Sequence, residues 1–344
     1  MKTGIATHTA LALIAAGFAT TIAVRAKRMR RTYDFSGKSV VITGGSRGLG
    51  LVLARQLASE GARITLIARD EDDLRRAAAD IYDRHPSAHV LIVPADVRER
   101  EDATRAVSQA IGRYGSIDVL INNAGIIQVG PLDHMKLPDY DDAMKTHFWG
   151  PLFLVLATLP HMRRQGGGRL VNISSIGGRI SVPHLVPYSA SKFALTGLSD
   201  GLRAELARDR IVVTTVCPGL MRIGSPVNAT FKGQRSQEYS WFAVASSLPV
   251  MTISAERAAC QILDACRRGD AELVITVQAK LAVLARTLAP ELFSDAMSLV
   301  HRLLPRPAGP EGDVAEPGRS VASEWASSTV LAPMYAAAQK NNEL

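Results

Sequence analysis

Seven short apolar runs alternate with longer amphipathic segments in the middle of the chain, and this alternation narrows the possible folds more than any other feature. The runs are continuously apolar, as expected for strands that are covered on both faces. Strands that alternate with helices form parallel sheets. The sequence therefore predicts an α/β fold, a doubly wound parallel sheet of about seven strands with helices on both faces. The expected strands are Ser39–Thr43, Arg63–Ala68, His89–Pro94, Val119–Asn122, Arg169–Ile173, Ile211–Cys217 and Leu273–Thr276.

The first expected strand runs into a glycine-rich turn, Gly44–Gly50, which is followed by an amphipathic helix. Glycines allow the backbone to take positive φ values and to approach a pyrophosphate closely. The N-terminus of the helix would stabilise the charge of that pyrophosphate. The spacing is Gly-x-x-x-Gly-x-Gly, which differs from the common dinucleotide fingerprint Gly-x-Gly-x-x-Gly.

A second group of residues places a hydroxyl, a phenol and an ammonium where they could act on one carbonyl. Tyr188 and Lys192 are four residues apart in an expected helix, so both side chains leave the same face. Ser175 follows the run Arg169–Ile173, at the strand end where open α/β sheets keep their sites. A nearby ammonium would lower the pKa of the phenol from its ordinary value of about 10. The alternative is that the serine belongs to a turn and that the other two residues lie on an ordinary helix face.

Together these patterns resemble the short-chain dehydrogenase/reductase family, in its compact NAD(P)-dependent form. The resemblance covers the chain from about Ser39 to Thr276 and implies a Rossmann-like fold. Four motifs occur in the family's order and spacing: Thr43–Gly50, Asn122–Gly125, Ser175 with Tyr188 and Lys192, and Pro218–Gly219. The expected cofactor-binding residues are Gly44, Ser46, Arg47, Gly48, Leu49, Gly50, Arg69, Asp96, Val97, Asn123, Ala124, Gly125, Tyr188, Lys192, Pro218 and Gly219, and no metal site is expected.

The resemblance also implies a mechanism. Ser175 would hydrogen-bond a carbonyl oxygen, and Tyr188 would give that oxygen a proton as a hydride arrives from the nicotinamide. Lys192 would lower the pKa of the tyrosine and hold the nicotinamide ribose. We expect an oxidoreductase that interconverts a hydroxyl and a carbonyl on a hydrophobic, lipid- or steroid-like small molecule. The alternative is an NADP-binding protein without turnover, in a sensor or structural role.

The end of the second expected strand favours NADP over NAD. NAD-preferring folds keep an acid there for the ribose 2′-hydroxyl, whereas an arginine suits a 2′-phosphate. In this family the acid would align with Ala68, and Arg69 follows it. Arg47 in the glycine loop is a second cation for the same phosphate. Alternatively Asp70 is the ribose acid, although it fits better as the N-cap of the next helix.

Two positions depart from the family's pattern. His147 stands where most relatives have an asparagine that holds a water linked to the active-site lysine. The histidine either relays protons in its place or is a packed polar residue. Ile223 stands where relatives commonly have a threonine near the nicotinamide, which puts the affinity for that group in doubt.

The N-terminal segment predicts a membrane anchor. Residues Ile5–Val24 include no charged side chain and, as a helix, would be about 30 Å long, the thickness of a bilayer core. A basic cluster within Arg25–Arg31 follows, so the positive-inside rule predicts a cytoplasmic catalytic domain with the N-terminus outside. Anionic lipid is the expected partner of this cluster, and nucleic acid is not expected because the rest of the chain has no basic stripe. An interfacial or buried helix and a cleaved signal peptide are the alternatives.

We expect three parts: an anchor with its basic cluster at 1–31, a catalytic domain at 36–277 and a C-terminal extension at 278–344. Within the domain, Gly224–Leu248 is the expected substrate lid, and its aromatic residues favour an apolar substrate. In the extension, Gln278–Leu304 is expected to be helical and to cover the site, touch membrane or pair subunits in a homo-oligomer. Arg306–Glu324 is expected to be mobile. The three cysteines offer no disulfide framework, which suits a reducing compartment.

Overall fold

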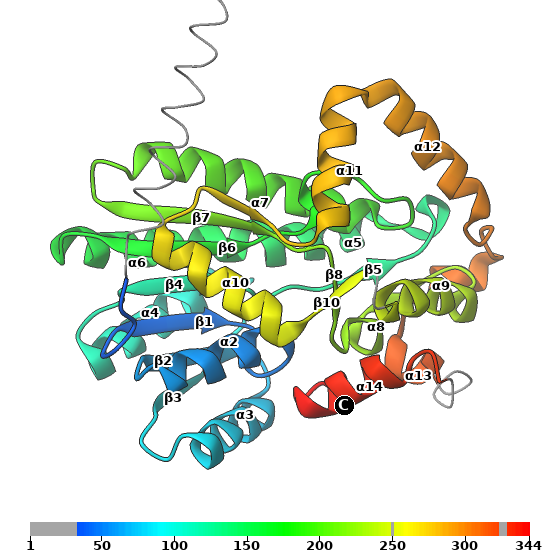
Figure 1. Ribbon diagram of the computed structural model, residues 1–344. Helices are drawn as coiled ribbons and strands as arrows, with labels where there is room; N and C mark the ends of the chain where they lie inside the picture. The colour runs from blue at the N-terminus through cyan, green and yellow to red at the C-terminus, as the bar shows by residue number, and fades with distance from the viewer. Residues whose placement is uncertain (1–32, 249–250, 323–328) are drawn as a thin grey trace, which may run out of the picture.

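The computed structural model describes residues 33–248, 251–322 and 329–344 (Figure 1). The predicted membrane anchor and basic cluster, residues 1–31, lie outside this part of the chain. Within the described ranges, no helix combines the length and the apolar character needed to cross a membrane. The described chain begins at Tyr33, whose ring lies 4.1 Å from the guanidinium carbon of Arg169.

A seven-stranded parallel sheet forms the centre of the molecule, in the order β11-β7-β6-β4-β1-β2-β3. The predicted fold class is therefore confirmed, and six of the seven predicted strands agree with the structure to within one residue. The last strand is shorter than predicted because Ile275 and Thr276 already lead into the next helix. The strands are β1 Ser39–Thr43, β2 Arg63–Ala68, β3 His89–Pro94, β4 Val119–Asn122, β6 Gly168–Ile173, β7 Ile211–Cys217 and β11 Glu272–Val274.

Helices cover both faces of this sheet and explain why its strands are continuously apolar (Figure 1). Val40 and Ile42 of β1 belong to the core beneath one set of helices. Val41, between them, belongs to the core beneath the other set. Successive residues of a strand point to opposite faces, so both sets of positions must be apolar. The first set comprises α2 Gly48–Ser59, α3 Glu71–Arg84 and α10 Ala255–Arg268, and the second comprises α4 Arg100–Tyr114, α6 Gly150–Arg164 and α7 Val186–Glu205.

The strand order creates a switch point between β1 and β4. From β1 the chain builds outward through β2 and β3, then returns to place β4 on the other side of β1. In open α/β sheets, dinucleotides bind outside the carboxyl ends of the strands at such a switch point. The glycine-rich turn and the Asn122–Gly125 motif follow these two strands directly.

Shorter elements build a second layer over the carboxyl ends of the strands. The expected lid contains α8 Ser225–Asn228 and α9 Arg235–Ser247, and its Phe231 and Tyr239 are fully buried. Between β4 and β6 the chain forms α5 Leu137–Met144, which continues through one π-helical turn, η2 Lys145–Trp149, into α6. The small strands are β5 Gln128–Val129, β8 Leu220–Arg222, β9 Thr230–Phe231, β10 Thr252–Ser254 and β12 Glu316–Pro317.

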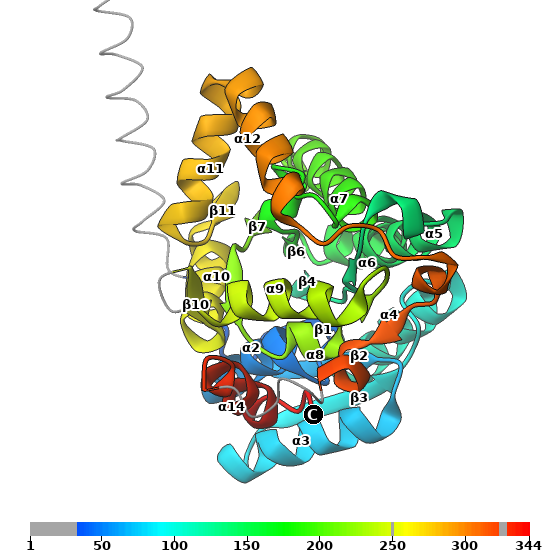
Figure 2. The same cartoon turned by 90° about the vertical axis from the view of Figure 1, so that its right-hand side faces the viewer.

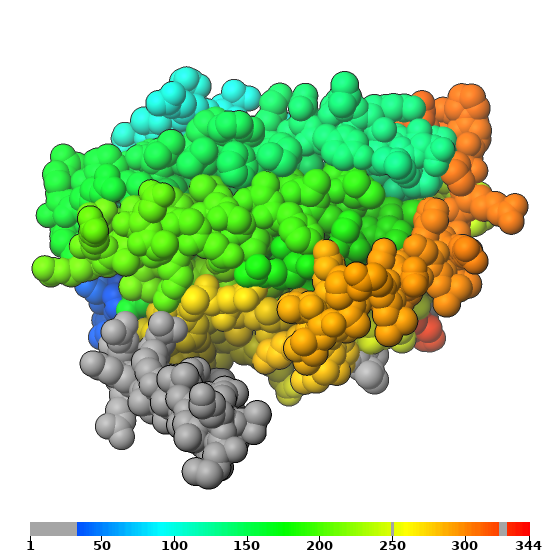
Figure 3. Space-filling model, turned by 90° about the horizontal axis from the view of Figure 1, so that it is seen from above, coloured from blue at the N-terminus to red at the C-terminus, as the bar shows by residue number. Residues whose placement is uncertain are grey.

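The C-terminal extension begins with two helices, α11 Val277–Leu288 and α12 Pro290–Leu303, which separate at Ala289. They project from the body as an arm and lie along the edge of the molecule seen from above (Figures 1 and 3). Leu288, Leu292 and Leu303 are more than two-thirds exposed, at 74%, 71% and 80%. No residue of α12 is buried.

The segment expected to be mobile, Arg306–Glu324, differs from that expectation over its described residues. It forms β12, which pairs antiparallel with β9 of the lid, and the short helix α13 Gly318–Val321. Arg235 of α9 also forms an ion pair with Glu316, at 3.0 Å. The composition is polar and rich in Gly and Pro, but the edge of the small sheet offers it backbone partners. The chain then ends in α14 Ala332–Lys340 and the tail 341–344.

Candidate active site

The glycine loop has a backbone conformation and close contacts that only glycine fits at three of its positions. Gly44 and Gly48 have φ values of +62° and +55°, in the left-handed region that favours glycine. A Cβ atom on Gly50 would lie only 2.1 Å from the carbonyl oxygen of Gly44. The loop therefore folds tightly under the first turn of α2, whose N-cap, Arg47, offers no side-chain hydrogen bond to the helix N-terminus. Such a cradle of backbone N–H groups fits the phosphates of a dinucleotide.

The motif after β4 supports this loop from one side. The Oγ1 atom of Thr43 accepts hydrogen bonds from the backbone N–H groups of Asn123 and Ala124, at 2.9 and 3.0 Å. The side-chain amide of Asn123 donates to the carbonyl oxygens of Thr43 and Gly44. Asn122 donates to the side chain of Asn172 and so ties β4 to β6. Asn123 thus fixes the glycine loop instead of pointing its amide toward a ligand.

Ser175, Tyr188 and Lys192 are brought together at the ends of β6 and α7. Ser175 follows β6, and its Oγ accepts a hydrogen bond from the N–H of Gly177, at 3.0 Å. Its hydroxyl also lies near the phenol of Tyr188 and affects the pKa of that group. Lys192 is buried one helical turn farther along, with its Nζ 5.8 Å from the centre of the tyrosine ring. A Cβ on Gly177 would lie 3.0 Å from the ring, so this glycine lets the hydroxyl and the phenol meet.

The pKa values in this cluster differ from the expectation that the lysine lowers that of the tyrosine. Burial raises the pKa of Tyr188 to about 12, although the neighbouring hydroxyl of Ser175 opposes the rise. Burial lowers the pKa of Lys192 to about 7. The Nζ of Lys192 donates to the carbonyl oxygen of Ile173, at 2.9 Å, so the ammonium is directed to the strand and not to the phenol oxygen. Loss of water on burial is therefore the main cause of both pKa shifts.

His147 lies at the centre of the site as a neutral, fully hydrogen-bonded side chain. Its Nε2 accepts from the N–H of Ile126 at 3.1 Å, so the ring proton is on Nδ1, which donates to Ser191 Oγ at 2.8 Å. Ser191 in turn donates to the carbonyl oxygen of Tyr188. Burial, together with the charge of Lys192, holds the pKa of His147 well below its ordinary value. The ring also packs edge to face on Tyr188, so this residue connects the turn after β4 to the helix of the tyrosine.

The residues expected to read the 2′-phosphate lie at the outer edge of the loop. Arg69 is exposed directly after β2. Asp70 caps α3, with its Oδ1 accepting from the N–H of Asp73 at 2.8 Å, as expected. Arg47 is partly exposed and lies 3.8 Å from Asp73. The side chains of both arginines are thus accessible to a phosphate group.

The remaining expected residues occupy the walls of the site. Burial opposes ionisation of Asp96, but hydrogen bonds from Arg98 outweigh it and lower the pKa of this carboxyl group. The side chains of Leu49 and Val97 belong to the two apolar cores. The carbonyl oxygen of Pro218 accepts from the N–H of Ile176 at 2.7 Å, which connects the loop after β7 to the loop of Ser175.

The departure at position 223 has a structural counterpart. The side chain of Ile223 is 7% exposed and belongs to the apolar core on the α2 and α10 side of the sheet. A threonine there would offer a hydroxyl, whereas the isoleucine offers only apolar surface. The backbone N–H of the next residue, Gly224, is bound by the side chain of Glu343 at 2.6 Å.

Sequence reasoning missed a buried polar group beneath the lid. His184 lies one turn before Tyr188 with a φ of +65°, unusual for a residue other than glycine. Its Nδ1 contacts both carboxylate oxygens of Glu238, at 2.8 and 3.0 Å, and Trp241 Nε1 donates to the same carboxylate at 2.7 Å. The group connects α9 to the start of the catalytic helix. No local sequence pattern predicts this contact, because His184 and Glu238 are 54 residues apart.

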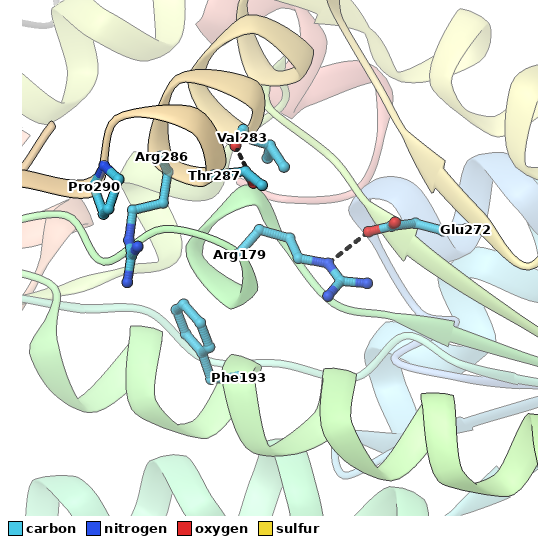
Figure 4. A pocket seen from close by; sticks show the side chains of 7 residues that line it. All are labelled: Arg179, Phe193, Glu272, Val283, Arg286, Thr287 and Pro290. Carbon is cyan, nitrogen blue, oxygen red and sulfur yellow. Dashed lines mark hydrogen bonds and ion pairs between the residues drawn. The ribbon is translucent and has the colours of Figure 1, made fainter. Parts of the chain in front are cut away.

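A cavity of about 460 Å³ lies apart from these residues, between α7 and the arm (Figure 4). None of the expected catalytic or cofactor-binding residues lines it. Arg179 points across it to Glu272, with which it pairs at 2.6 Å (Figure 4). The other lining residues are Phe193, Val283, Arg286, Thr287 and Pro290.

Comparisons with known proteins agree with this geometry. Residues 38–234 match the family model described as short chain dehydrogenase. A dehydrogenase/reductase SDR family protein 7-like from Anopheles gambiae is 32% identical over 272 residues, which cover 78% of this chain and 84% of the relative. The 11-beta-hydroxysteroid dehydrogenase A of Sesamum indicum is 32% identical over 284 residues, covering 81% and 79%.

Among solved structures, the L-sorbose reductase of Gluconobacter frateurii, complexed with NADPH and L-sorbose, superposes with a TM-score of 0.63 at 26% identity. The match covers 71% of this chain and 97% of that reductase. The parallel sheet, the glycine loop at its switch point and the joined serine, tyrosine and lysine are all accounted for by one assignment. The chain belongs to the short-chain dehydrogenase/reductase family and is an oxidoreductase of that class.

Proposed function

We propose that this enzyme uses NADP to interconvert a hydroxyl and a carbonyl on a hydrophobic, lipid- or steroid-like small molecule. The observation that carries the proposal is the convergence of Ser175, Tyr188 and Lys192 at the carboxyl end of β6, beside the glycine loop. A bound nicotinamide dinucleotide would supply the hydride. Ser175 would hold the carbonyl oxygen of the substrate, and Tyr188 would donate a proton to it.

The protonation states of the cluster suit the reductive direction. With a pKa raised to about 12, Tyr188 carries its proton at neutral pH and can act as the acid. Its donor strength would increase if Lys192 turned from the carbonyl of Ile173 toward the phenol, because a cation favours phenolate. We propose that Lys192 makes this movement when the ribose of the dinucleotide binds.

The choice of NADP is supported by charge at the loop edge. Arg69 directly follows β2, Arg47 lies in the glycine loop, and Asp70 is engaged as the cap of α3. An acid engaged in capping is a poor partner for a ribose hydroxyl. Paired arginines favour the doubly charged 2′-phosphate.

The surroundings of Tyr188 support a hydrophobic substrate. The tyrosine packs against an apolar cluster that includes Val129, Leu185 and Phe242, and Trp241 packs against the same cluster. A polar substrate would lose water there without gaining partners. The sesame relative is named as a hydroxysteroid dehydrogenase, which agrees with an apolar ring system as substrate.

Purified protein should oxidise NADPH in the presence of apolar ketones, such as steroid ketones, and much more slowly with NADH or with sugar ketones. Tyr188→Phe is the matched control, since it retains the ring and removes the hydroxyl. Tight NADPH binding with no oxidation across the panel would instead support the non-catalytic alternative.

We further propose that residues 1–31 attach the enzyme to a membrane, with the catalytic domain on the cytoplasmic side. The support is the uncharged run Ile5–Val24 followed by the basic cluster. Full-length protein should pellet with membranes and resist a high-salt wash, which screens purely electrostatic attachment. Deletion of residues 1–31 should give a folded protein in the supernatant, because β1 begins only at Ser39. If the truncated protein still pellets and resists salt, the attachment lies elsewhere, and the exposed arm α11–α12 becomes the first region to test.

A further inference from the structure

The last residues of the chain lie in the glycine loop. The N–H of Gly48, the first residue of α2, donates to the carbonyl oxygen of Asn341 at 2.9 Å. The side-chain amide of Asn342 donates to the carbonyl oxygens of Ser46 and Asp73, at 2.9 and 3.2 Å. Figures 1 and 2 show the C-terminus beside α2 and α3. Residues at opposite ends of the sequence thus meet at the expected phosphate site.

The carboxylate of Glu343 reaches furthest into this site. The side chain is 7% exposed, and its Oε2 accepts from the N–H of Gly224 at 2.6 Å. A Cβ atom on Gly48 would lie 3.0 Å from its Oε1, so the carboxylate also lies against the start of α2. Burial raises the pKa of Glu343 to about 7, against the hydrogen bond from Gly224 and the charge of Arg47. A carboxyl group of the chain itself is thereby placed between the glycine loop and the start of α8.

The tail is held in this position by a built set of contacts. Arg55 of α2, only 9% exposed, donates to the side chain of Asn341 at 2.7 Å and to the carbonyl oxygen of Lys340 at 2.8 Å. Arg76 of α3 donates to the side chain of Asn342 at 3.1 Å. Asn342 has a φ of +58°, which turns the chain back toward the loop. These contacts come from α2 and α3 together, so the tail docks on the same two elements that would flank a dinucleotide.

A phosphate and the tail require the same donors. The oxygens of a phosphate at a helix N-terminus accept from the first free N–H groups, and the N–H of Gly48 is already bound by Asn341. A phosphate group would also have to displace the carboxylate of Glu343, because two anions cannot share one small cradle. We propose that the C-terminal segment Lys340–Leu344 is an intramolecular competitor of the dinucleotide, which must displace this segment in order to bind. The proposal rests on the proposed binding of a dinucleotide to this loop.

Under such competition, the apparent Kd equals the intrinsic Kd divided by the fraction of molecules in which the site is open. If the tail is docked in about nine of ten molecules, the apparent Kd for the dinucleotide rises about tenfold. Partners that draw the tail away from α2 and α3 would then increase cofactor binding without touching the reaction site.

The test measures NADPH binding by fluorescence titration of the full-length protein and three variants. Deletion of residues 341–344, and separately Glu343→Ala, should lower the Kd, the deletion by at least about tenfold. Deletion of Leu344 alone is the matched control and should leave the Kd unchanged, since this side chain is 63% exposed. An unchanged Kd in both the deletion of 341–344 and Glu343→Ala would overturn the competition.

Hydrogen–deuterium exchange provides a readout that does not depend on turnover. Saturating NADPH should raise exchange in the peptide that contains residues 334–344 while lowering it in the glycine loop. Protection of both segments by NADPH would overturn the proposal, since tail and cofactor would then bind together. If neither the full-length nor the shortened protein binds NADPH or NADH, the proposed cofactor function fails, and the competition fails with it. Binding with equal Kd values leaves the function intact and rejects the competition alone.

Discussion

At the reaction end of the site the functional groups are side chains, with Ser175 and Lys192 buried and Tyr188 partly buried, whereas at the dinucleotide end they are backbone N–H groups and two arginines that are partly or fully exposed. Burial shifts the pKa values of Tyr188 and Lys192 in opposite directions. Arg47 and Arg69 instead remain accessible to solvent. Buried groups act through their protonation states, and accessible cations act through the partners they attract. Changes at the reaction end should therefore alter the rate of chemistry, and changes at the dinucleotide end should alter cofactor affinity and choice.

The largest expected effect comes from removing the phenol. Tyr188→Phe should lower the rate of ketone reduction by at least about a hundredfold, because the proton donor is lost while the ring packing on His147 remains. The Kd for NADPH should change little. Steady-state kinetics and a binding titration of the same preparation provide the two numbers. Near-normal turnover would reject the role of the tyrosine, and a large change in Kd would remove the contrast between the two ends.

The second prediction concerns stability and pH at the reaction end. The pKa of Lys192 is lowered to about 7 in the folded protein. Between about pH 7 and the ordinary pKa of lysine, the unfolded chain therefore binds more protons than the folded one. Stability should therefore rise with pH in this window, by about 1 kcal/mol per pH unit from this group. Tyr188 acts in the opposite sense, but only above the ordinary tyrosine range, since its pKa is raised.

Lys192→Met is the variant that isolates this effect, because it keeps the length of the side chain and removes the charge. We would measure the urea midpoints of the original and the variant proteins at several values from about pH 7 upward. The midpoint of the original protein should rise toward that of the variant as the pH rises. If the two midpoints instead change with pH in parallel, Lys192 is not desolvated in solution. The contrast in burial between the reaction end and the dinucleotide end would then be smaller than the structure indicates.

At the dinucleotide end we expect a change in choice and not in chemistry. Arg69→Asp should lower the NADP:NAD ratio of kcat/KM by about tenfold or more, because it removes a cation and puts a like charge beside the 2′-phosphate. The rate of the reductive step under saturating cofactor should stay close to that of the original protein. An unmoved ratio would mean that Arg47 or another group reads the phosphate.

The smallest effect is expected at the connection between the lid and the catalytic helix. Glu238→Gln keeps the shape of the side chain but weakens its bonds to His184 and Trp241, so KM for the ketone should rise about two- to fivefold with little change in kcat. Gln237→Ala, an exposed neighbour on α9, is the matched control. An equal fall in kcat would place this pair in the reaction end itself.

Most strands of the central sheet could be predicted from local patterns in the sequence. Buried parallel strands need apolar residues on both faces, and this requirement made the bounds of β1, β2, β3, β4 and β7 readable in advance. The glycine loop could also be predicted, because Gly44 and Gly48 have positive φ values and Gly50 has no room for a Cβ atom. Tyr188 and Lys192 were linked by one helical turn.

What the sequence could not supply depends on contacts between distant residues. The tail meets Arg55 across 286 residues, and nothing in the polar segment 341–344 marks it as a docking peptide. The pKa shifts of Tyr188 and Lys192 depend on burial, which spacing alone does not reveal. The pairing of β12 with β9 gave structure to a segment whose composition indicated mobility. The roles of the site residues, the domain limits and the membrane anchor stay predictions.

We propose above all that this site transfers a hydride from NADPH to a ketone while Tyr188 supplies the proton. A direct test uses NADPH with deuterium at both positions of the transferring nicotinamide carbon, an apolar ketone and mass analysis of the product. We expect one deuterium on the new carbinol carbon of the alcohol, with product formation that depends on the Tyr188 hydroxyl. Product without deuterium, or deuterated product formed at an equal rate by Tyr188→Phe, would contradict it.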